Sequence, residues 1–426
     1  MSIILILLFL LLVILRIPLA IAIGSVTMLY IWMTDSLSLM GMVLDVFQSL
    51  DRFPLLAVPL FILAGQLMAT GGVAKRILHL ADEIGGNIKG SYAIVTIFSC
   101  VFFGGLSGSA PATVAAIGSL MIPAMIKQGY DAGFAAGVAA CSGVLAVIIP
   151  PSNPMIVYAL VGNTSVGQLF LAGFIPGLIL SLGMSVPAYI VSRKNGWGGD
   201  RHRGTWKSIR KAALNAKWAL LAPVIILGGI YTGVFTPTES AAVACLYSFI
   251  IGLWVHRDFN WRNVPTILRT AALPVASVML LVTFATALGN ALTMEGVPQR
   301  FADYIGQITD SPILTILIIN VMLLAVGCFM DVLAAIIILT PLLYPIVEGF
   351  GISPVHFGII MVINLGIGFV TPPFGSNLFI ANQICGTRIQ NVFIGAFPLI
   401  LGMIVALLLI TFVPWLTLVI PGLFYK

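Results

Sequence analysis

Charge is scarce in this 426-residue chain, in which 8% of the residues are charged and 60% are hydrophobic. So little charge excludes an ordinary soluble domain, in which about a quarter of the residues are charged. Apolar runs long enough to cross a bilayer follow one another along almost the whole sequence. The composition therefore predicts an all-α polytopic membrane protein that lies in a lipid bilayer.

Cysteine pairs and a leader pattern are also lacking. The five cysteines stand singly in apolar surroundings, so their spacing indicates neither a disulfide framework nor a zinc site. The first apolar run has no basic n-region and no small-residue cleavage pattern. We therefore expect it to belong to the mature protein.

Basic residues are unevenly distributed. The formal net charge is +6, but eight of the twenty lysines and arginines fall within residues 193–217, where Asp200 is the one acid. By the positive-inside rule this segment is a cytoplasmic linker, and the charge does not indicate a nucleic-acid partner. Contact with anionic lipid headgroups is a possible additional role.

The linker separates two halves, and the first covers residues 1–192. Residues 73–88 alternate charged and apolar residues at helical spacing, which fits an interfacial helix. Three prolines in Pro150–Pro154 interrupt the next apolar run, because proline removes a donor and clashes with the preceding turn. The predicted elements are scaffold spans within 3–70, a re-entrant hairpin at 92–126 with its tip at Gly104–Pro111, a broken helix at 132–161 and a span at 166–191. Residues 3–33 form either one bent span or two short ones.

The second half, residues 218–426, repeats the first. Prolines and glycines recur at a near-constant offset of 222 positions, as in Pro150 and Pro372 or Gly105 and Gly327. The predicted elements are scaffold spans at 218–255 and 271–293, a hairpin at 312–347, a broken helix at 353–384 and a span at 392–414. The tips differ, because Ser107 and Ser109 align with Phe329 and Asp331.

Loop charges indicate that the two halves are inverted. Residues 75–89, 193–217 and 257–269 are basic, whereas residues 35–51 and 295–310 are acidic. With the basic loops inside, the two hairpins enter the membrane from opposite faces. Inverted repeats with paired broken helices are typical of secondary transporters. A channel built from parallel repeats is the alternative.

The helix breaks offer oxygen ligands. Broken helices leave carbonyl groups without intrahelical partners, and neutral hydroxyls and amides surround them. Such clusters suit a monovalent hard cation such as Na⁺. The first predicted sodium site comprises Gly105, Ser107, Ser109, Pro150, Ser152 and Asn153. The second comprises Gly327, Asp331, Gly366, Thr371, Pro372 and Gly375. The alternative is that the prolines only kink the helices and the hydroxyls bond to their own helices.

The same breaks begin new helices, whose free N–H groups and positive dipoles favour a substrate carboxylate. The predicted substrate-binding residues are Ser107, Gly108, Ser109, Ser152, Asn153, Thr371, Gly375, Ser376 and Asn377.

Ionisable side chains at membrane depth are few, which favours sodium over proton coupling. Asp331 lies near a predicted hairpin tip, either as an ion ligand or as the N-cap of the second hairpin arm. We assign His79, His202, His256 and His356 to interfaces or loops. An intramembrane hydrolase is the alternative from another class, because Gly105–Ser109 superficially suggests a nucleophile turn. No base is predicted at that depth, so we expect no enzyme.

Several motifs together resemble one family over nearly the whole chain: Gly104–Ala110, Gly129–Asp131, Pro150–Ser152, Asp331, Pro354–Gly358 and Thr371–Pro373. They resemble the large membrane subunit (M subunit) of TRAP transporters, the tripartite ATP-independent periplasmic transporters. The resemblance implies a sodium-driven importer of organic acids in a bacterial inner membrane, with an elevator-type transport domain that carries both hairpins, as in the ion transporter superfamily. It also implies a small four-helix membrane subunit (Q type) and a periplasmic substrate-binding protein (P type). Because the chain begins with the large-subunit pattern, we expect the small subunit to be a separate polypeptide.

The substrate is less sharply indicated. The run Pro150–Met155 resembles the sialic-acid branch of the family, which implies N-acetylneuraminate. A C4-dicarboxylate or a sugar acid is the alternative.

Overall fold

The computed structural model describes residues 5, 8–9, 11–12, 15, 17–34, 38–85, 89–198, 205–309 and 311–425. Within these residues every regular element is a helix, which confirms the predicted all-α membrane fold. Eight of these helices are long and apolar enough to cross a bilayer: Phe53–Thr70, Ala110–Lys127, Val166–Asn195, Trp206–Tyr231, Pro237–Val255, Val264–Met294, Val332–Gly349 and Ile389–Phe412. Most of the first apolar run lies outside the described residues.

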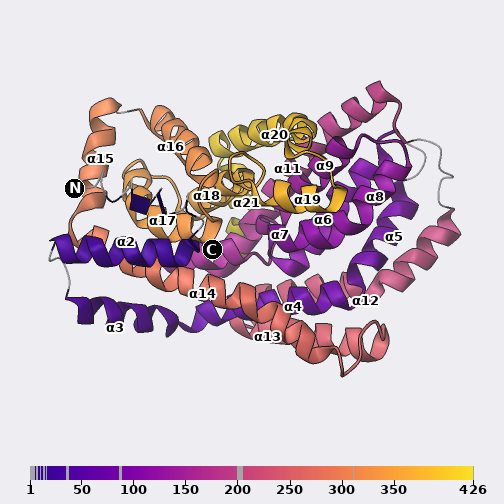
Figure 1. Cartoon of the computed structure of the whole chain (residues 1–426), viewed down its shortest axis with the longest axis horizontal. Helices are drawn as coiled ribbons and strands as arrows, with labels where there is room; N and C mark the ends of the chain where they lie inside the picture. The colour runs from indigo at the N-terminus through magenta and orange to yellow at the C-terminus, as the bar shows by residue number, and fades with distance from the viewer. Residues whose placement is uncertain are drawn as a thin grey trace.

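The first half begins with helices that lie along one side of the molecule and then forms a hairpin and a broken helix (Figure 1). Its elements are α2 (Leu19–Thr34), α3 (Leu39–Leu50), the 3₁₀ turn η1 (Phe53–Leu56), α4 (Ala57–Thr70), α5 (Val73–Gly85), α6 (Ser91–Ser107), α7 (Ala110–Thr113), the π-helical η2 (Val114–Gly118), α8 (Ser119–Lys127), α9 (Ala132–Gly143), the 3₁₀ turn η3 (Val144–Val147), α10 (Asn153–Val161) and α11 (Val166–Asn195). The hairpin is thus α6 followed by α7–α8, and the break separates η3 from α10.

The second half has a hairpin, a broken helix and a long helix in the same order. Its elements are α12 (Trp206–Tyr231), α13 (Pro237–Ile250), the π-helical η4 (Ile251–Val255), α14 (Val264–Met294), α15 (Val297–Ile308), α16 (Pro312–Gly327), α17 (Val332–Gly349), α18 (Pro354–Gly368), α19 (Ser376–Cys385), α20 (Ile389–Phe412) and α21 (Trp415–Phe424). Much of the predicted linker is helical, because α11 ends at Asn195 and α12 begins at Trp206; its residues 199–204 lie outside the described part. The terminal helix α21 is not anticipated by the repeat.

The helices form two layers. In the scaffold layer, α4 packs against α13 and α14, and α2 and α3 also pack against α14. The hairpin layer contains α6–α11 and α16–α21, with α9 against α19 and α20 and with α16 against α18. Figure 1 shows α3, α4 and α13 along the lower edge and the hairpin layer above them.

Packing between the halves is reciprocal. Helix α4 of the first half packs against α13 of the second half. The equivalent contact in the repeat is the one between α14 and α2. Helix α9 likewise packs against α20, while α18 packs against α11. Such an exchange is the pattern that a two-fold relation between repeats produces, and inverted-repeat transporters have such an axis. A parallel arrangement of independent halves would not require it.

Close helix contacts depend on small residues. A Cβ built at Gly137 in α9 would lie 2.5 Å from the Ala396 nitrogen of α20, and one built at Gly133 would meet the Asn391 carbonyl. In a membrane, helices associate through such close packing rather than through water exclusion. A side chain at either glycine would push α9 and α20 apart.

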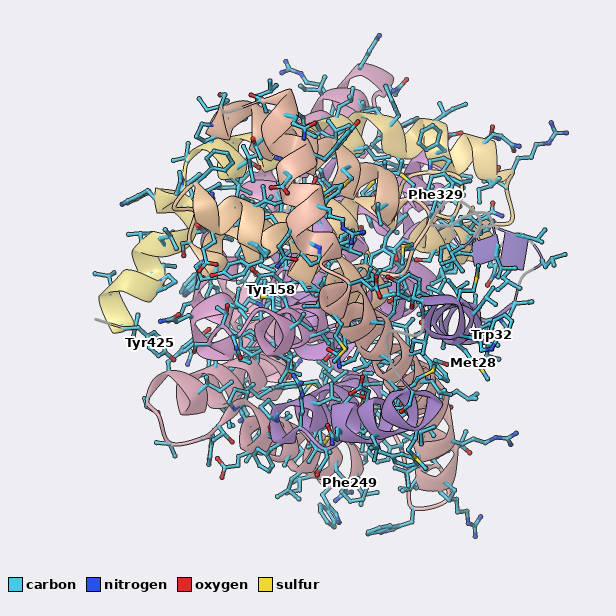
Figure 2. The ribbon with its side chains drawn as sticks, turned by 90° about the vertical axis from the view of Figure 1, so that its left-hand side faces the viewer. Met28, Trp32, Tyr158, Phe249, Phe329 and Tyr425 are labelled. Carbon is cyan, nitrogen blue, oxygen red and sulfur yellow. The ribbon has the colours of Figure 1, made fainter. Side chains whose placement is uncertain are left out.

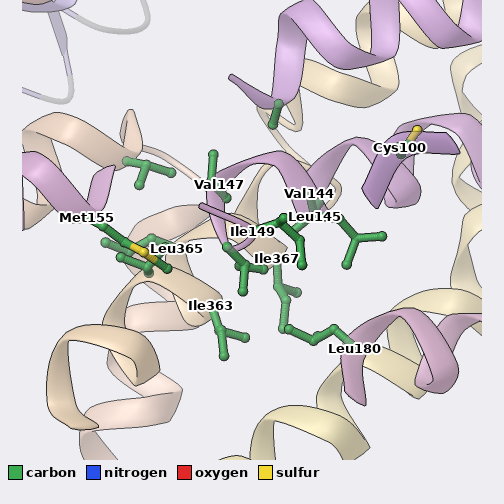
Figure 3. Close-up of a cluster of buried hydrophobic side chains, with 14 of the residues drawn as sticks. Cys100, Val144, Leu145, Val147, Ile149, Met155, Leu180, Ile363, Leu365 and Ile367 are labelled. Carbon is green, nitrogen blue, oxygen red and sulfur yellow. The ribbon is translucent and has the colours of Figure 1, made fainter. Parts of the chain in front are cut away.

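The core joins the first break to the second half. Val144 and Val147 of η3 belong to the same buried cluster as Ile363 and Leu365 of α18, and the two elements pack against each other (Figure 3). Gly366 faces the same valines, since its Cβ would lie 3.1 Å from Val144 Cγ1 and 3.2 Å from Val147 Cγ2. The position of one broken helix is therefore fixed by the other half of the chain.

The outer surface is apolar, as expected for contact with lipid. Met28 and Trp32 project outward from α2, and Trp32 is 73% exposed (Figure 2). Exposed apolar residues recur every fourth position on α11, at Leu178, Leu182, Val186 and Ile190. Patches of this extent on a soluble monomer are rare.

Candidate functional site

The first hairpin tip is a short non-helical link between two helices. Helix α6 ends at Ser107, and Gly108 takes a left-handed conformation with φ 57°. The Gly108 amide donates to the Gly104 carbonyl at 2.9 Å, and the extended Ser109 precedes α7. Glycine adopts this conformation without steric cost, which explains the residue at this point. Ser107 Oγ lies 2.7 Å from Thr113 Oγ1 across the tip.

The first break follows η3. Ser152 caps α10, and its hydroxyl donates to the Val147 carbonyl at 2.6 Å. The Pro150–Pro151 peptide bond is cis, as is its counterpart Pro372–Pro373. Asn153 is buried, and its Oδ1 atom has no hydrogen-bond partner among the described residues.

Glycines at the tip bring the first hairpin onto the first break. A Cβ at Gly105 would lie 3.0 Å from the Pro150 carbonyl oxygen, and one at Gly108 would lie 3.0 Å from the Pro151 carbonyl oxygen. The Asn153 amide is also close to Gly108. The residues predicted for the first sodium site are therefore brought together from two segments, the hairpin tip and the break, next to the Pro150 and Pro151 carbonyl oxygens.

The second hairpin tip meets the second break in a similar way. The Gly327 and Gly368 backbones touch, because a Cβ on Gly368 would overlap the Gly327 carbonyl group. The Phe374 amide donates to the Cys328 carbonyl at 3.3 Å. Thr371 Oγ1 donates to the Ile367 carbonyl of its own helix at 2.9 Å. Of the second predicted sodium site, Gly327 lies against the end of α18 just before the break, whereas Gly366 faces η3.

Asp331 caps the second arm of the second hairpin. Its Oδ1 accepts a hydrogen bond from the Leu333 amide at 2.9 Å, which is the N-cap geometry of α17. A single cap bond uses part of the accepting capacity of a carboxylate, which has about four lone-pair sites. The N-cap role therefore does not exclude an ion at the same side chain.

A cavity of about 430 Å³ lies between the two layers. Its walls include four of the predicted substrate residues, Ser107, Gly108, Ser109 and Asn153, together with Asp331. The remaining predicted substrate residues do not line it in this arrangement: Ser152, Thr371, Gly375, Ser376 and Asn377. Asn377 instead donates from Nδ2 to the Ala140 carbonyl at 3.0 Å.

Three of the predicted residues keep an oxygen unpaired although it is buried: Asn153 Oδ1, Ser376 Oγ and Asn377 Oδ1. Buried polar atoms without a partner are uncommon in native proteins and usually mark water, an ion or a ligand. Neutral amide and hydroxyl oxygens are the ligand type that a hard cation accepts. Asn153, the one of the three that belongs to a predicted sodium site, therefore offers a free oxygen of the kind that fits a sodium ion.

Helix N-termini point to the same cavity. The first residues of α7, α10 and α17 all contribute to its walls: Ala110, Asn153 and Val332. Each helix start presents the positive end of the helix dipole. Pro111 and Pro154 have no N–H group, and the Met155 and Leu333 amides are bonded to their caps, so the other first-turn amides are the available donors. Asp331 is the single ionisable side chain among the lining residues, and none of them is basic. The cavity is therefore suited to an anion held by backbone and neutral donors.

The scaffold layer contributes residues that the sequence analysis missed. Gln66 of α4 and Thr270 and Ser277 of α14 line the cavity. Gln66 has a visible signal, because it is the one amide side chain in the apolar sequence of α4. Nothing in the sequence alone indicates that α14 comes close to the hairpin tips.

His356, which the sequence assigned to an interface or loop, lies in the first turn of a helix and not in a loop. His356 is the third residue of α18 and is 3% exposed, because α20 and α21 cover it. Its Nδ1 lies 2.8 Å from Thr417 Oγ1, and its Nε2 lies 3.2 Å from the Thr411 carbonyl. A neutral imidazole satisfies both contacts by donating from one nitrogen and accepting at the other. His202 lies outside the described residues.

Comparison with known proteins gives a family match over most of the chain. Residues 5–416 match the family described as "Tripartite ATP-independent periplasmic transporter, DctM component". The chain is 45% identical over 414 residues to the isethionate TRAP transporter permease protein DctMQ of Oleidesulfovibrio alaskensis, covering 97% of this chain and 65% of that protein. It is 40% identical to the C4-dicarboxylate TRAP transporter large permease protein DctM of Pseudomonas aeruginosa, covering 90% of each.

A sialic acid relative is nearly as similar. Identity to the sialic acid TRAP transporter large permease protein SiaM of Vibrio cholerae is 37%, over 96% of this chain and 95% of that protein. Among solved structures, the YdaH transporter of Alcanivorax borkumensis has a TM-score of 0.59 at 15% identity, covering 89% of this chain and 90% of that one. At that identity the likeness shows the fold alone.

Proposed function

Because this chain belongs to the DctM component family of tripartite ATP-independent periplasmic transporters, we propose that it is the large membrane subunit of a sodium-coupled importer of an organic acid. The observation that carries the proposal is the cavity between the layers, where three helix N-termini meet without a basic side chain. Such a site attracts an anion through fixed dipoles. The permease names of the relatives favour transport over the hydrolase alternative.

Sodium coupling is supported by the charge and oxygen content of the site. Asp331 faces the cavity, and its carboxylate would repel a substrate anion. A bound cation removes that repulsion, so substrate and ion would bind best together. Gly105, Gly108, Asn153 and the Pro150–Pro151 carbonyls would hold one Na⁺, and Gly327 with the break at Thr371–Gly375 would hold a second. When bound, the ion supplies positive charge next to the substrate.

We propose that the present arrangement is an inward-facing state. The cavity reaches Thr270, Pro274 and Ser277, which are exposed residues in the first half of α14. That end of α14 follows the basic segment 257–269, which the positive-inside rule puts in the cytoplasm. On the opposite side, α10 packs against α4 and η1. An elevator mechanism would carry the hairpin layer past the scaffold layer to open the periplasmic side.

Family membership implies two partners and a membrane. We propose a small Q-type membrane subunit beside the scaffold layer, a P-type periplasmic binding protein that delivers substrate, and a location in a bacterial inner membrane with segment 193–217 in the cytoplasm. The small subunit is either separate or fused, since this chain covers 65% of a relative whose name, DctMQ, joins both letters.

We propose N-acetylneuraminate as the substrate, because the Pro150–Met155 run resembles the sialic-acid branch. Isethionate and C4-dicarboxylates are the alternatives, because relatives are named for them. All three are organic anions that fit the charge of the cavity. Relatives with each name are 37–45% identical to this chain, so identity does not choose among them.

The test is uptake into proteoliposomes that contain the chain with its small subunit and its binding protein. Labelled N-acetylneuraminate, succinate and isethionate are offered at rising external sodium, with choline as the control cation. We expect uptake of one of them to rise and saturate with sodium. Uptake that ignores sodium would refute the coupling, and uptake of none would refute the proposed substrate class.

A further inference from the structure

We propose that Gln66 of the scaffold helix α4 binds the anionic group of the substrate directly, and does so when the cavity faces the cytoplasm. The inference rests on the proposed function and adds a specificity-determining residue outside the two hairpins and the two breaks. It follows from how α4 meets the tip of the first hairpin.

Gly65 allows α4 to touch that tip. A Cβ at Gly65 would lie 2.8 Å from the Ser107 Cα atom and 3.3 Å from its carbonyl oxygen. No side chain can therefore separate the two backbones at this point. The neighbouring Gln66 consequently reaches the same cavity as Ser107, Ser109 and Asn153. Helix α4 packs against α6, which ends at the tip.

The chemistry of Gln66 matches an anion. A primary amide offers two N–H donors, which can pair with two oxygens of a carboxylate or a sulfonate. Within the described residues, no hydrogen bond from the Gln66 side chain is found, although its backbone carbonyl accepts from Thr70 Oγ1 at 2.9 Å. The side chain is half-buried and lies where no basic residue competes for the anion.

The proposed contact between Gln66 and the substrate forms only when the cavity faces the cytoplasm. Gln66 is part of the scaffold layer, where α4 is packed against α13 and α14, whereas Ser107 and Asn153 belong to the hairpin layer. When the hairpin layer moves toward the periplasm with its substrate, Gln66 stays behind. Gln66 would thus strengthen binding on the cytoplasmic side alone and set how readily the substrate leaves.

The experiment measures affinity on each side of the membrane. Proteoliposomes carrying the complete transporter are preloaded with increasing unlabelled substrate, chosen as whichever of N-acetylneuraminate, succinate and isethionate the wild type transports. Exchange with external labelled substrate gives the half-saturating internal concentration. The external value is measured on the same vesicles. The variants are Gln66→Ala and Gln66→Glu, with Gln128→Ala as the matched control, since Gln128 is exposed at the end of α8.

We expect Gln66→Ala to raise the internal half-saturating concentration about tenfold, which is the loss of one hydrogen bond to a charged group. Gln66→Glu should raise it further, because its carboxylate repels the anion. The external value and the control variant should not change. An equal rise on both sides, or no rise, would overturn the inference. A wild type that exchanges none of the three anions would instead refute the proposed function, so the two failures are distinguishable.

Discussion

Replacing Gly65 with alanine tests whether the two layers move against each other. The new methyl group would stand 2.8 Å from Ser107 Cα, a backbone atom that cannot rotate away. It would therefore push the hairpin tip from α4 in the present arrangement. If the hairpin layer moves past the scaffold, the clash disappears in the other end state.

The size of the effect follows from two opposing terms. Alanine in a helix interior is favoured over glycine by about 1 kcal/mol, but this gain belongs to α4 itself and is the same in both states. Overpacking costs about 1–3 kcal/mol and applies only where the tip touches α4. The difference would shift the ratio of inward-facing to outward-facing molecules by about 5–150-fold toward outward.

Spin labels on exposed residues report that ratio. Val224 on α12 and Val405 on α20 are 64% and 67% exposed, so a label at each should not disturb packing. In a background without the five native cysteines, we expect Gly65→Ala to shift the distance distribution between the labels. The matched control is Gly228→Ala in α12, where a Cβ meets nothing within 4 Å. Identical distributions in the two variants would refute a tip that docks on α4 in one state.

Three further results are expected. Asp331→Asn should keep the N-cap of α17, because an amide oxygen still accepts a hydrogen bond from the Leu333 amide. The sodium dependence of uptake should weaken in this variant. An unchanged sodium dependence would mean that Asp331 acts only as the cap. Arg76→Asp should lower the free energy of unfolding by about 1 kcal/mol or less, and Arg76→Asp with Asp258→Arg should recover it, because their 2.6 Å ion pair is partly exposed; a double variant no better than the single one would contradict this. Burial lowers the pKa of His256 in the folded protein below its ordinary 6.5. Because the unfolded protein then binds a proton at this residue at a higher pH than the folded protein does, the free energy of unfolding should fall as the pH drops below about 6.5. In thermal unfolding measured against pH, His256→Asn should reduce this decrease.

Much of the fold follows from sequence periodicity. The hairpin predicted at 92–126 corresponds to helices from Ser91 to Lys127, and the broken helix predicted at 132–161 begins and ends at those residues. Both follow from local chemistry, because apolar runs need a helix in lipid and Pro-Pro pairs cannot continue one. The repeat then supplies the second half from the first.

The site could be predicted only in part, because its assembly depends on contacts between distant segments. Ser107 and Asn153 are recognisable as polar residues at breaks, and both line the cavity. Gln66 and Ser277 reach it only because the scaffold layer packs against the hairpin tips. His356 was misplaced for the same reason: α21 buries it, and no local pattern shows where α21 packs.

The two halves share one order of elements but occupy different environments, and this difference bears on transport. Helix α10 packs against α17 and α18, just as its counterpart α19 packs against α7, α8 and α9. Helix α10 also packs against α4 and η1 of the scaffold layer, and α19 has no comparable contact with α14. The two repeats share one order of elements and related break motifs, so the contacts that one repeat makes are also open to the other. Exchanging the two environments would put α19 against α14 and free α10, which closes the cytoplasmic side and opens the other. Under the proposed elevator mechanism, a fold with two unequal halves would contain the geometry of both end states, and the ion and substrate would need to supply only the small free-energy difference that selects between them.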